Sequence, residues 1–598
     1  MLNSSKGRRS LATFAAACLL SVALPAGAAF AQKQKNKDVA PPPAAEMSID
    51  YVVSIPTVTG VDSSIDDATL TDILSGAFVE NADALAGLDA TSITVPEIAV
   101  TVKSTRADEV KETTITFSNL VLENVTDGVA DSVSLGSIGM ETGEGTVDFG
   151  AMSAANFDIG GVLGIYGLVD RGGQTALETI YTDFTAEGGS IDMTDGSCTI
   201  GGTYGAEFKA RPLKMPFGEM IALAQELEDD PDTMDPALIG QVMRMYADIL
   251  TAFETSEVTF DGFSCDITDE QGRPMNFAIA SMTLGGMSPG TYPSIVLEGL
   301  NIAVEDDGAI SLDNFTFKPM DLSGTIAVLE GAPELVDEAW LEANARGLIP
   351  AMEGFSLSGM SVDVPDPDNE EARVKADIGN FDLTLGSYVN GIPTLLDTSA
   401  ANIQVALPEN GGDEQMQQLI ALGVTDIDAG FRLAANWDEA NSTIVLEEAS
   451  VTGANLATVK LAGTIANATA DLFALDTDTA LMAAMGVAIQ SLNLDVTDAG
   501  LSDIVLAAAA AEQGGDPAAL RPIFAGLAEG TIIGFMAGAA DAAKLGAAVN
   551  SFVSGTAKSL NITIDAKSAP GLGLEDFMAA EEDLTTLLGK VNISATAK

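Results

Sequence analysis

The chain of 598 residues carries 27 basic and 87 acidic side chains, which gives a formal net charge of −60. A surface this acidic repels nucleic acid and anionic lipid head groups, which excludes nucleic acid as a partner, and it attracts divalent cations. Apolar residues make up 47% of the sequence, which excludes a disordered chain, and the length exceeds one hydrophobic core, which predicts several domains or a repeat array.

The first predicted element is a secretory signal peptide over residues 1–31. An uncharged apolar run, residues 11–25, follows a positive start and precedes small residues at a cleavage site. The positive residues are Lys6, Arg8 and Arg9, and the small residues are Ala29 and Ala31. Cleavage after Ala31 predicts an exported protein that is periplasmic, outer-membrane-associated or secreted. The rival interpretation is an uncleaved anchor, and both the general secretory and the twin-arginine export routes stay open.

Residues 32–47 are rich in lysine and proline and are predicted to form a linker. Beyond it, residues 531–540 are apolar, but the run is short and Asp541 follows it. We therefore expect no transmembrane segment in the mature chain.

Period-two alternation rich in Thr, Val, Ile and Ser predicts half-buried strands through much of the chain, as in residues 113–117 and 442–446. Stretches with apolar residues at helical spacing interrupt them. These predicted helices cover residues 69–85, 236–253, 334–345, 479–489 and 517–549, with a shorter one at 175–184.

A short block recurs along the chain and indicates an internal repeat. Its copies are Ser190–Asp195, Ser264–Asp269, Ser361–Asp366 and Asn493–Asp498, with a degenerate copy at Ser559–Asp565. Each copy follows a predicted helix, so the predicted unit is helix, strand, Asp-bearing turn and further strand. The fold class predicted is α+β and mainly β, an elongated curved or grooved antiparallel sheet built from degenerate helix–strand repeats.

The repeats and composition divide the mature chain into three predicted regions. Residues 48–290 form an N-terminal β-rich repeat region with a helical insertion, and residues 291–400 form a central repeat. Residues 401–598 hold the C-terminal repeats, ending in a helix and strands.

The recurring aspartates admit two interpretations. They are Asp192 and Asp195, Asp266 and Asp269, Asp363 and Asp366, and Asp495 and Asp498. Clustered carboxylates suit calcium, which takes six to eight oxygens. An aspartate also closes a strand with an Asx-type turn, which is the favoured interpretation, because no copy has the loop of an EF-hand or a calcium β-roll. Weak calcium binding through overall charge remains open.

The cysteine and histidine content limits which covalent cross-links and which catalytic or metal-binding sites the chain can form. After cleavage only Cys198 and Cys265 remain, and two cysteines in an oxidising compartment predict a disulfide, with two separately buried thiols as the alternative. The chain has no histidine, which removes the commonest general base and metal ligand. We therefore predict no catalytic residue, no cofactor and no enzymatic activity.

Strand units such as 119–128 and 381–386, and the ending from Ser559 to Ser594, carry a resemblance to a family of proteins. The chain resembles uncharacterised β-repeat envelope proteins of alphaproteobacteria, which are distantly similar to the AsmA-like and YdgA-like families. That resemblance implies a long β-groove that shelters lipid chains between membranes. AsmA-like proteins keep an N-terminal anchor, whereas this chain has a predicted cleavable signal.

Two functions are compatible with the sequence. The first is an acidic, non-catalytic envelope protein that binds an apolar ligand, most simply a lipid, or supports outer-membrane homeostasis. It predicts a groove lined by Val, Ile, Leu and Met. The second is a structural or surface protein whose acidic repeats make cation-bridged contacts, and it predicts a sheet filled by its own side chains.

Overall fold

The computed structural model describes residues 47–598 apart from 107–108, 143–144, 217–218, 221–222, 224–235, 270, 306, 367–368, 408–413, 514, 537–538, 540 and 583. The predicted signal peptide, and all of the predicted linker but its last residue, lie outside the described residues. One compact unit comprises Asp50–Lys103 with Glu112–Lys598 and holds the core, the disulfide and the candidate surface described below. The other comprises Met1–Ile49 with Ser104–Lys111, few of which are described.

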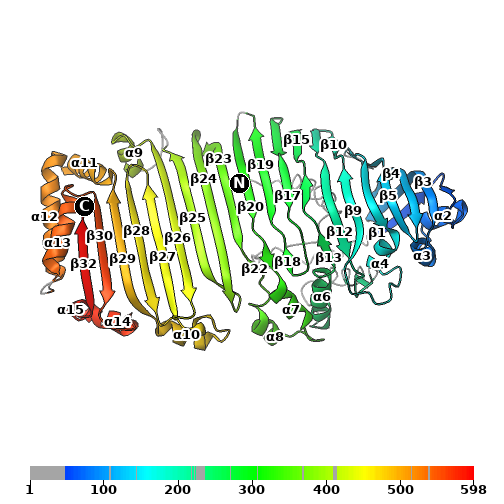
Figure 1. Cartoon of the computed structure of the whole chain (residues 1–598). Helices are drawn as coiled ribbons and strands as arrows, with labels where there is room; N and C mark the ends of the chain where they lie inside the picture. Colours follow the sequence, from blue (N-terminus) through cyan, green and yellow to red (C-terminus); the bar gives the residue numbers. More distant parts are fainter. Residues whose placement is uncertain are drawn as a thin grey trace. The chain divides into compact units, whose positions relative to one another are not determined.

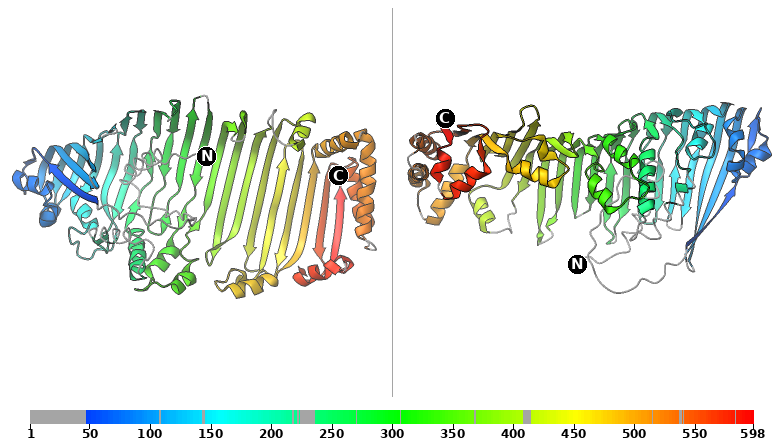
Figure 2. Two further views of the ribbon diagram at one scale, coloured as in Figure 1. Left: turned by 180° about the vertical axis from the view of Figure 1, so that it is seen from behind. Right: turned by 90° about the horizontal axis from the view of Figure 1, so that it is seen from below.

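The protein is 49% strand and 26% helix, and 29 of the strands in its described part join one sheet. The strand pairs described below are antiparallel. The large antiparallel sheet and the strand content confirm the predicted α+β, mainly β class. Figures 1 and 2 show the long strands from β19 to β32 following one another in chain order along this sheet.

The best-buried core lies at the start of the larger unit. Its strands are β2 (Thr59–Val61), β3 (Ala90–Arg106) and β4 (Glu109–Thr126), and its helices are α2 (Asp67–Leu74), α3 (Phe78–Ala86) and α4 (Ile159–Ile165). Ile73, Leu88 and Val95 are no more than 1% exposed there. Asp127 and Gly128 both have positive φ in the tight turn after β4, the geometry that a two-residue hairpin loop requires.

From β4 onward the sheet divides into two lines of short strands. One line is β5 (Val129–Leu135), β8 (Met152–Asp158), β9 (Glu178–Ala186), β12 (Thr203–Ala210), β14 (Val258–Phe260) and β17 (Ser281–Leu284). The other is β6 (Ser137–Thr142), β7 (Gly145–Phe149), β10 (Gly189–Met193), β11 (Gly196–Ile200), β15 (Phe263–Thr268) and β16 (Pro274–Ile279). Both lines end on β19 (Ile295–Val304), where β16 and β17 pair with successive parts of one strand.

Beyond β19 each strand pairs with the next long strand in sequence. The strands are β20 (Gly308–Phe317), β23 (Gly354–Asp366), β24 (Asn369–Val389), β25 (Ile392–Ala406), β26 (Asp426–Asp438), β27 (Thr443–Gly453), β28 (Ala457–Ala466), β29 (Ala488–Asp498), β30 (Ser559–Ala566) and β32 (Val591–Ala597). Short strands β13 (Phe253–Thr255) and β31 (Leu572–Gly573) extend the sheet at β12 and β29. A separate small sheet joins β18 (Thr291–Tyr292), β21 (Met320–Asp321) and β22 (Ala351–Met352).

The later helices connect strand ends, and many begin at an aspartate. They are α6 (Pro236–Ile249), α7 (Ser323–Glu330), α8 (Glu338–Asn344), α9 (Glu414–Ala421), α10 (Thr477–Met485), α11 (Leu501–Gln513), α12 (Pro517–Phe535), α13 (Ala542–Val553), α14 (Leu574–Glu582) and α15 (Leu584–Leu588). Asp337, Asp476 and Asp516 cap α8, α10 and α12 by accepting a hydrogen bond from a backbone N–H of the first turn. Some of the many acidic residues thus serve as helix N-caps.

Several predicted helices are corrected by the structure. Residues 69–85 form two helices, α2 and α3, separated at Gly76, and residues 517–549 form α12 and α13. The predicted helix at 175–184 is wrong, because strand β9 occupies that segment. Its Ile180 and Phe184 have helical spacing, but the β-branched and aromatic residues between them suit a strand, and Ile180 is only 3% exposed.

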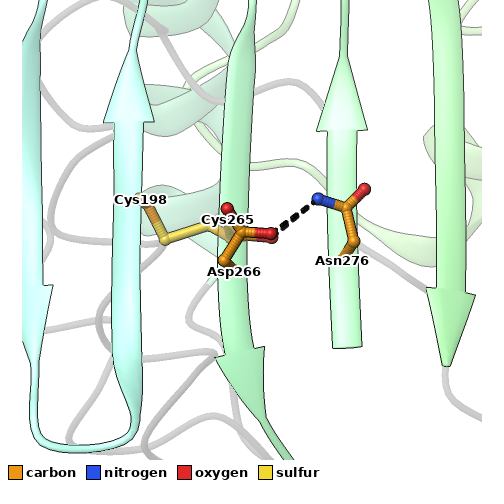
Figure 3. Close-up of a disulfide and its surroundings, with 4 residues drawn as sticks. All are labelled: Cys198, Cys265, Asp266 and Asn276. Carbon is orange, nitrogen blue, oxygen red and sulfur yellow. Dashed lines mark hydrogen bonds between the residues drawn. A yellow bond between two sulfur atoms is a disulfide. The ribbon is translucent and has the colours of Figure 1, made fainter. Parts of the chain in front are cut away.

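A disulfide joins Cys198 on β11 to Cys265 on β15 (Figure 3). The two residues are direct cross-strand partners, and their Cα atoms are 4.0 Å apart. Beside them Asn276 on β16 donates a hydrogen bond to Asp266 at 2.9 Å. The bridge closes a loop with a sequence separation of 67, which contains β12, β14 and α6.

The sheet runs through the predicted region boundaries. The boundary between residues 290 and 291 lies at the start of β18, and the boundary between residues 400 and 401 lies inside β25. The sheet continues from β17 to β19 and from β24 to β26 across both positions.

Candidate apolar-ligand surface

Two rows of apolar side chains cross the sheet from β14 to β32 on one face. Each row is a chain of direct cross-strand partners, and two residues along a strand separate the rows, which places both on the same face. The first apolar row is Phe260, Met282, Leu297, Phe315, Leu357, Phe381, Ala400, Phe431, Val451, Val459, Val496, Leu560 and Ala597. The second apolar row is Val258, Leu284, Ile295, Phe317, Phe355, Leu383, Thr398, Leu433, Ala449, Leu461, Leu494, Ile562 and Ala595.

Much of this apolar surface is open. Val451 is 63% exposed, and Phe431 and Leu433 are each 38% exposed. Only Ala400 and Leu560 of the two rows are classed as buried. Within the described part of the chain, no helix packs extensively on β19–β29. A contiguous exposed apolar surface of this kind marks a site of interaction.

Aromatic rings add to the surface where β20, β23 and β24 meet. The ring centroids of Phe315 and Phe355 lie 6.2 Å apart, and those of Phe355 and Phe381 lie 5.3 Å apart. These diagonal contacts confirm that the two apolar rows share one face, because residues on opposite faces cannot touch across the sheet.

The opposite face is polar along the same strands. Between the apolar rows runs a polar row: Thr259, Thr283, Val296, Thr316, Ser356, Asp382, Ser399, Arg432, Ser450, Lys460, Asp495, Asn561 and Thr596. Only Val296 departs from the pattern. At these three rows the sheet from β14 to β32 is therefore amphipathic, with an apolar and a polar face.

Ion pairs on the polar face neutralise several of its charges. Arg432 lies 2.8 Å from Asp397 and 3.4 Å from Glu448, and Lys460 lies 2.6 Å from Glu448. The hydrogen bond from Arg432 lowers the pKa of Asp397, and those from Lys460 and Ser450 lower the pKa of Glu448. These four charged side chains therefore neutralise one another, and none of them requires a bound ligand as a counter-charge.

At the C-terminal end of the sheet, helices cover the apolar face. Leu545 and Val549 of α13 pack with Ile562 and Ala595, the last members of the second apolar row. Between α12 and α13 lies an apolar hollow of about 430 Å³. Its lining is Phe524, Leu527, Ala528, Thr531, Ile532, Val549 and Val553. Val549 belongs to both groups, so the hollow adjoins the covered end of the apolar rows.

The recurring aspartates lie in separate turns and strands, and the fold does not bring the copies together into one cluster. Asp192 is an exposed strand residue of β10, and Asp195 lies in the turn that follows. Asp266 accepts the hydrogen bond from Asn276, and Asp269 accepts backbone hydrogen bonds from Gln271 and Arg273 in the β15–β16 turn. The turn at Asp269 has the Asx-type geometry that the sequence favoured.

The remaining copies are held by side chains from neighbouring strands. Asp363 on β23 lies 2.6 Å from Arg373, whose hydrogen bond lowers the pKa of Asp363, and Asp366 ends the same strand. Asp495 accepts hydrogen bonds from Asn493 and Asn561, each at 2.7 Å. Among the described residues no group of three or more acidic or cysteine side chains is arranged to hold a metal ion.

The fourth copy ends in a helix and not in further strand as the repeat predicted. Asp498 accepts hydrogen bonds from the hydroxyl and the backbone N–H of Ser502, at 2.7 and 3.0 Å, at the start of α11. Lys558 lies 3.3 Å away, and the Asp498 side chain is 8% exposed. Burial alone raises the pKa of Asp498, but these donors outweigh it and lower the pKa to about 2.

The low pKa predicts an acid-sensitive contribution to stability. Because the folded-state pKa lies below the unfolded value of 3.8, the carboxylate stabilises the fold fully above about pH 4 and loses this effect as the pH falls toward 2. Asp498→Asn should lower the free energy of unfolding at pH 7 by about 2 kcal/mol, and much less at pH 2. Urea unfolding midpoints at both pH values measure this. Asp192→Asn, at an exposed strand position, is the control, and an equal loss at both pH values for Asp498→Asn would contradict the assignment.

The expectation that no segment of the mature chain crosses a membrane stays a prediction, and one helix bears on it. Helix α12, Pro517–Phe535, is long and apolar enough to cross a membrane by length and composition, and 6% of the tested window is buried. The apolar run at residues 531–540 is short because Arg521 and Glu529 interrupt the apolar residues that precede it.

Comparison with known proteins places part of the chain in context. A family model described as an uncharacterised protein matches residues 450–598, the segment from β27 to the C-terminus that contains α12 and α13. No curated protein matches the chain, and no solved structure matches it.

Proposed function

We propose that this protein is an exported, non-catalytic envelope protein that binds the acyl chains of a lipid on its two apolar rows. The observation that carries the proposal is the exposure of apolar side chains on the successive strands β26, β27 and β28, with ion-paired charges on the opposite face. Transfer of an acyl chain from water to such a surface contributes about 0.8 kcal/mol for each CH₂ group that is buried.

The shape of the surface favours a chain-like ligand over a compact one. The apolar rows run across the strands, so a ligand lying along them contacts one side chain from each strand in turn. The phenylalanine rings at β20, β23 and β24 and the branched aliphatic side chains at β27 and β28 offer no hydrogen-bonding group. Thr398 is the one member of the two rows with a hydrogen-bonding side chain, so the surface selects by apolar area and length more than by head-group chemistry.

Native mass spectrometry of the purified protein, with lipid extraction, tests this function. Co-purified lipid that is released by extraction is the expected result. A protein free of lipid, with a melting temperature that rises with calcium, would instead support a surface protein that uses cation-bridged contacts.

A paired substitution locates the ligand. Val451→Glu places a charge at a 63% exposed position of the first apolar row, so it should leave folding intact and reduce the bound lipid about tenfold. The neighbouring Thr452 is exposed on the opposite face, so Thr452→Glu is the matched control and should retain lipid. Equal lipid content in the two variants would exclude the apolar rows as the binding surface.

A further inference from the structure

The outward side of α12 is apolar and uncharged. Ile523, Leu527 and Phe535 are 63, 64 and 68% exposed. Ile533 is 40% exposed and borders this side, because a Cβ added at Gly546 of α13 would lie 3.0 Å from its side chain. Added Cβ atoms at Gly526, Gly530 and Gly534 would meet no atom within 4 Å, so this side of the helix is open among the described residues. Fully exposed side chains of this size are unfavourable in water.

The two charged residues of α12 are both engaged with neighbouring helices. Arg521 is paired with Asp503 of α11, and Glu529 accepts a hydrogen bond from Asn550 of α13 at 2.9 Å. Both partners belong to the helices against which α12 packs. Both charged side chains of α12 thus point toward the protein, and neither lies on the exposed side of the helix.

The exposed apolar side chains and the inward-facing charges of α12 indicate which kind of partner can cover its open side. A protein partner of ordinary composition would present polar and charged groups to be matched, and α12 offers only the hydroxyl of Thr531 on its open side. A hydrocarbon layer requires only that no charge or unsatisfied backbone group enters it, which a continuous helix with inward-facing charges satisfies. The strong negative charge of the chain opposes anionic lipid, so the surface suits zwitterionic lipid.

We infer that α12 docks the protein on a zwitterionic lipid bilayer by inserting the side chains of Ile523, Leu527 and Phe535 into its interfacial region. The helix lies on the membrane and does not cross it, since its other side packs on α11 and α13. Leu527 also lines the hollow between α12 and α13, which adjoins the apolar rows through Val549. This docking goes beyond the proposed lipid binding and does not depend on it.

The fluorescence of a tryptophan introduced on the exposed side of α12 measures insertion of this helix into lipid. In the full chain, the fluorescence of Phe535→Trp should be quenched by phosphatidylcholine vesicles that carry bromine on their acyl chains. Val79→Trp, at a 69% exposed position of α3, is the matched control and should not be quenched. Trp340 and Trp437 are present in both variants and cancel in the comparison. Equal quenching of the two variants would overturn the inference.

A charge on the same face tests the affinity. Introducing Leu527→Glu into the Phe535→Trp chain should raise the lipid concentration for half-maximal quenching about tenfold or more. Val79→Glu in the same background should leave it unchanged, and an equal effect of both substitutions would contradict the assignment.

Two further outcomes separate this inference from its alternatives. Val451→Glu should reduce co-purified lipid without changing the quenching of Phe535→Trp, so failure of the proposed function and failure of docking are distinguishable. Self-association in analytical ultracentrifugation without lipid, abolished by Leu527→Glu, would show that a second copy of the chain covers α12 and would overturn membrane docking.

Discussion

Replacing Asp248 with asparagine is expected to lower the free energy of unfolding by about 3–5 kcal/mol, because it leaves a buried cation without its counter-charge. Arg211 Nη2 lies 2.7 Å from Asp248 Oδ1, and the two side chains are 9 and 5% exposed. The contact is an ion pair without hydrogen-bond geometry, since Asp248 Oδ1 accepts no hydrogen bond. The other carboxylate oxygen accepts the backbone N–H of Lys214 at 2.7 Å.

The position of the pair explains why its loss should be so unfavourable. Arg211 follows β12, Asp248 lies near the end of α6, and Arg211 also donates to the carbonyl oxygen of Asp248 and to the hydroxyl of Thr251. These bonds hold α6 against the end of the strand. Chemical denaturation measures the effect.

Two controls make the result specific. Asp363→Asn removes a partner of Arg373 where both side chains are 41% exposed, and it should change the free energy by no more than about 1 kcal/mol. Replacing both buried residues, Arg211→Met with Asp248→Leu, should recover much of the stability lost in Asp248→Asn. Similar losses in Asp248→Asn and Asp363→Asn would mean that Asp248 is accessible to water in solution.

Removal of the disulfide is expected to lower the free energy of unfolding by about 2–4 kcal/mol. The bridge spans a sequence separation of 67, so it restricts a large loop in the unfolded chain, and Cys198 and Cys265 are 5 and 8% exposed. Alanine is the suitable replacement at both positions, because serine would bury an additional hydroxyl group. The measurement is the urea midpoint of Cys198→Ala with Cys265→Ala against the oxidised parent.

Reduction of the parent protein gives an independent comparison. The reduced parent should unfold at nearly the same midpoint as the double variant, since β11 and β15 remain paired in both. An unchanged midpoint after complete reduction would show that these strands are already held together in the unfolded state.

Alternation along single strands was enough to predict the strands and their two faces. The segment Phe381-Asp-Leu-Thr-Leu of β24 places Phe381 and Leu383 on the apolar face and Asp382 on the polar face, as period-two alternation predicts. The segment 175–184 was misread because Ile180 and Phe184 satisfy a helical spacing within a strand. The strands that pair with β9 and fix its conformation are β8 and β12, and both lie outside the segment 175–184.

The candidate surface could not be predicted as a whole. Its rows depend on register, and register shifts interrupt the β25–β26 and β26–β27 pairings at Ala400 and Ala434. No local pattern reveals these irregularities. Whether helices cover the apolar face is likewise decided by tertiary packing, and the exposed side of α12 was hidden in the sequence by Arg521 and Glu529, whose side chains turn inward only once α11 and α13 are in place.

The simple strand order from β19 to β32 has a consequence for how the length of this protein can change. Because each strand pairs with the next long strand in sequence, insertion or deletion of one hairpin restores the same strand direction and the same face on both sides of the change. Each hairpin lengthens or shortens the two apolar rows by two strand spacings, about 10 Å. The length of the apolar rows can therefore change in steps of one hairpin without any change in which face is apolar.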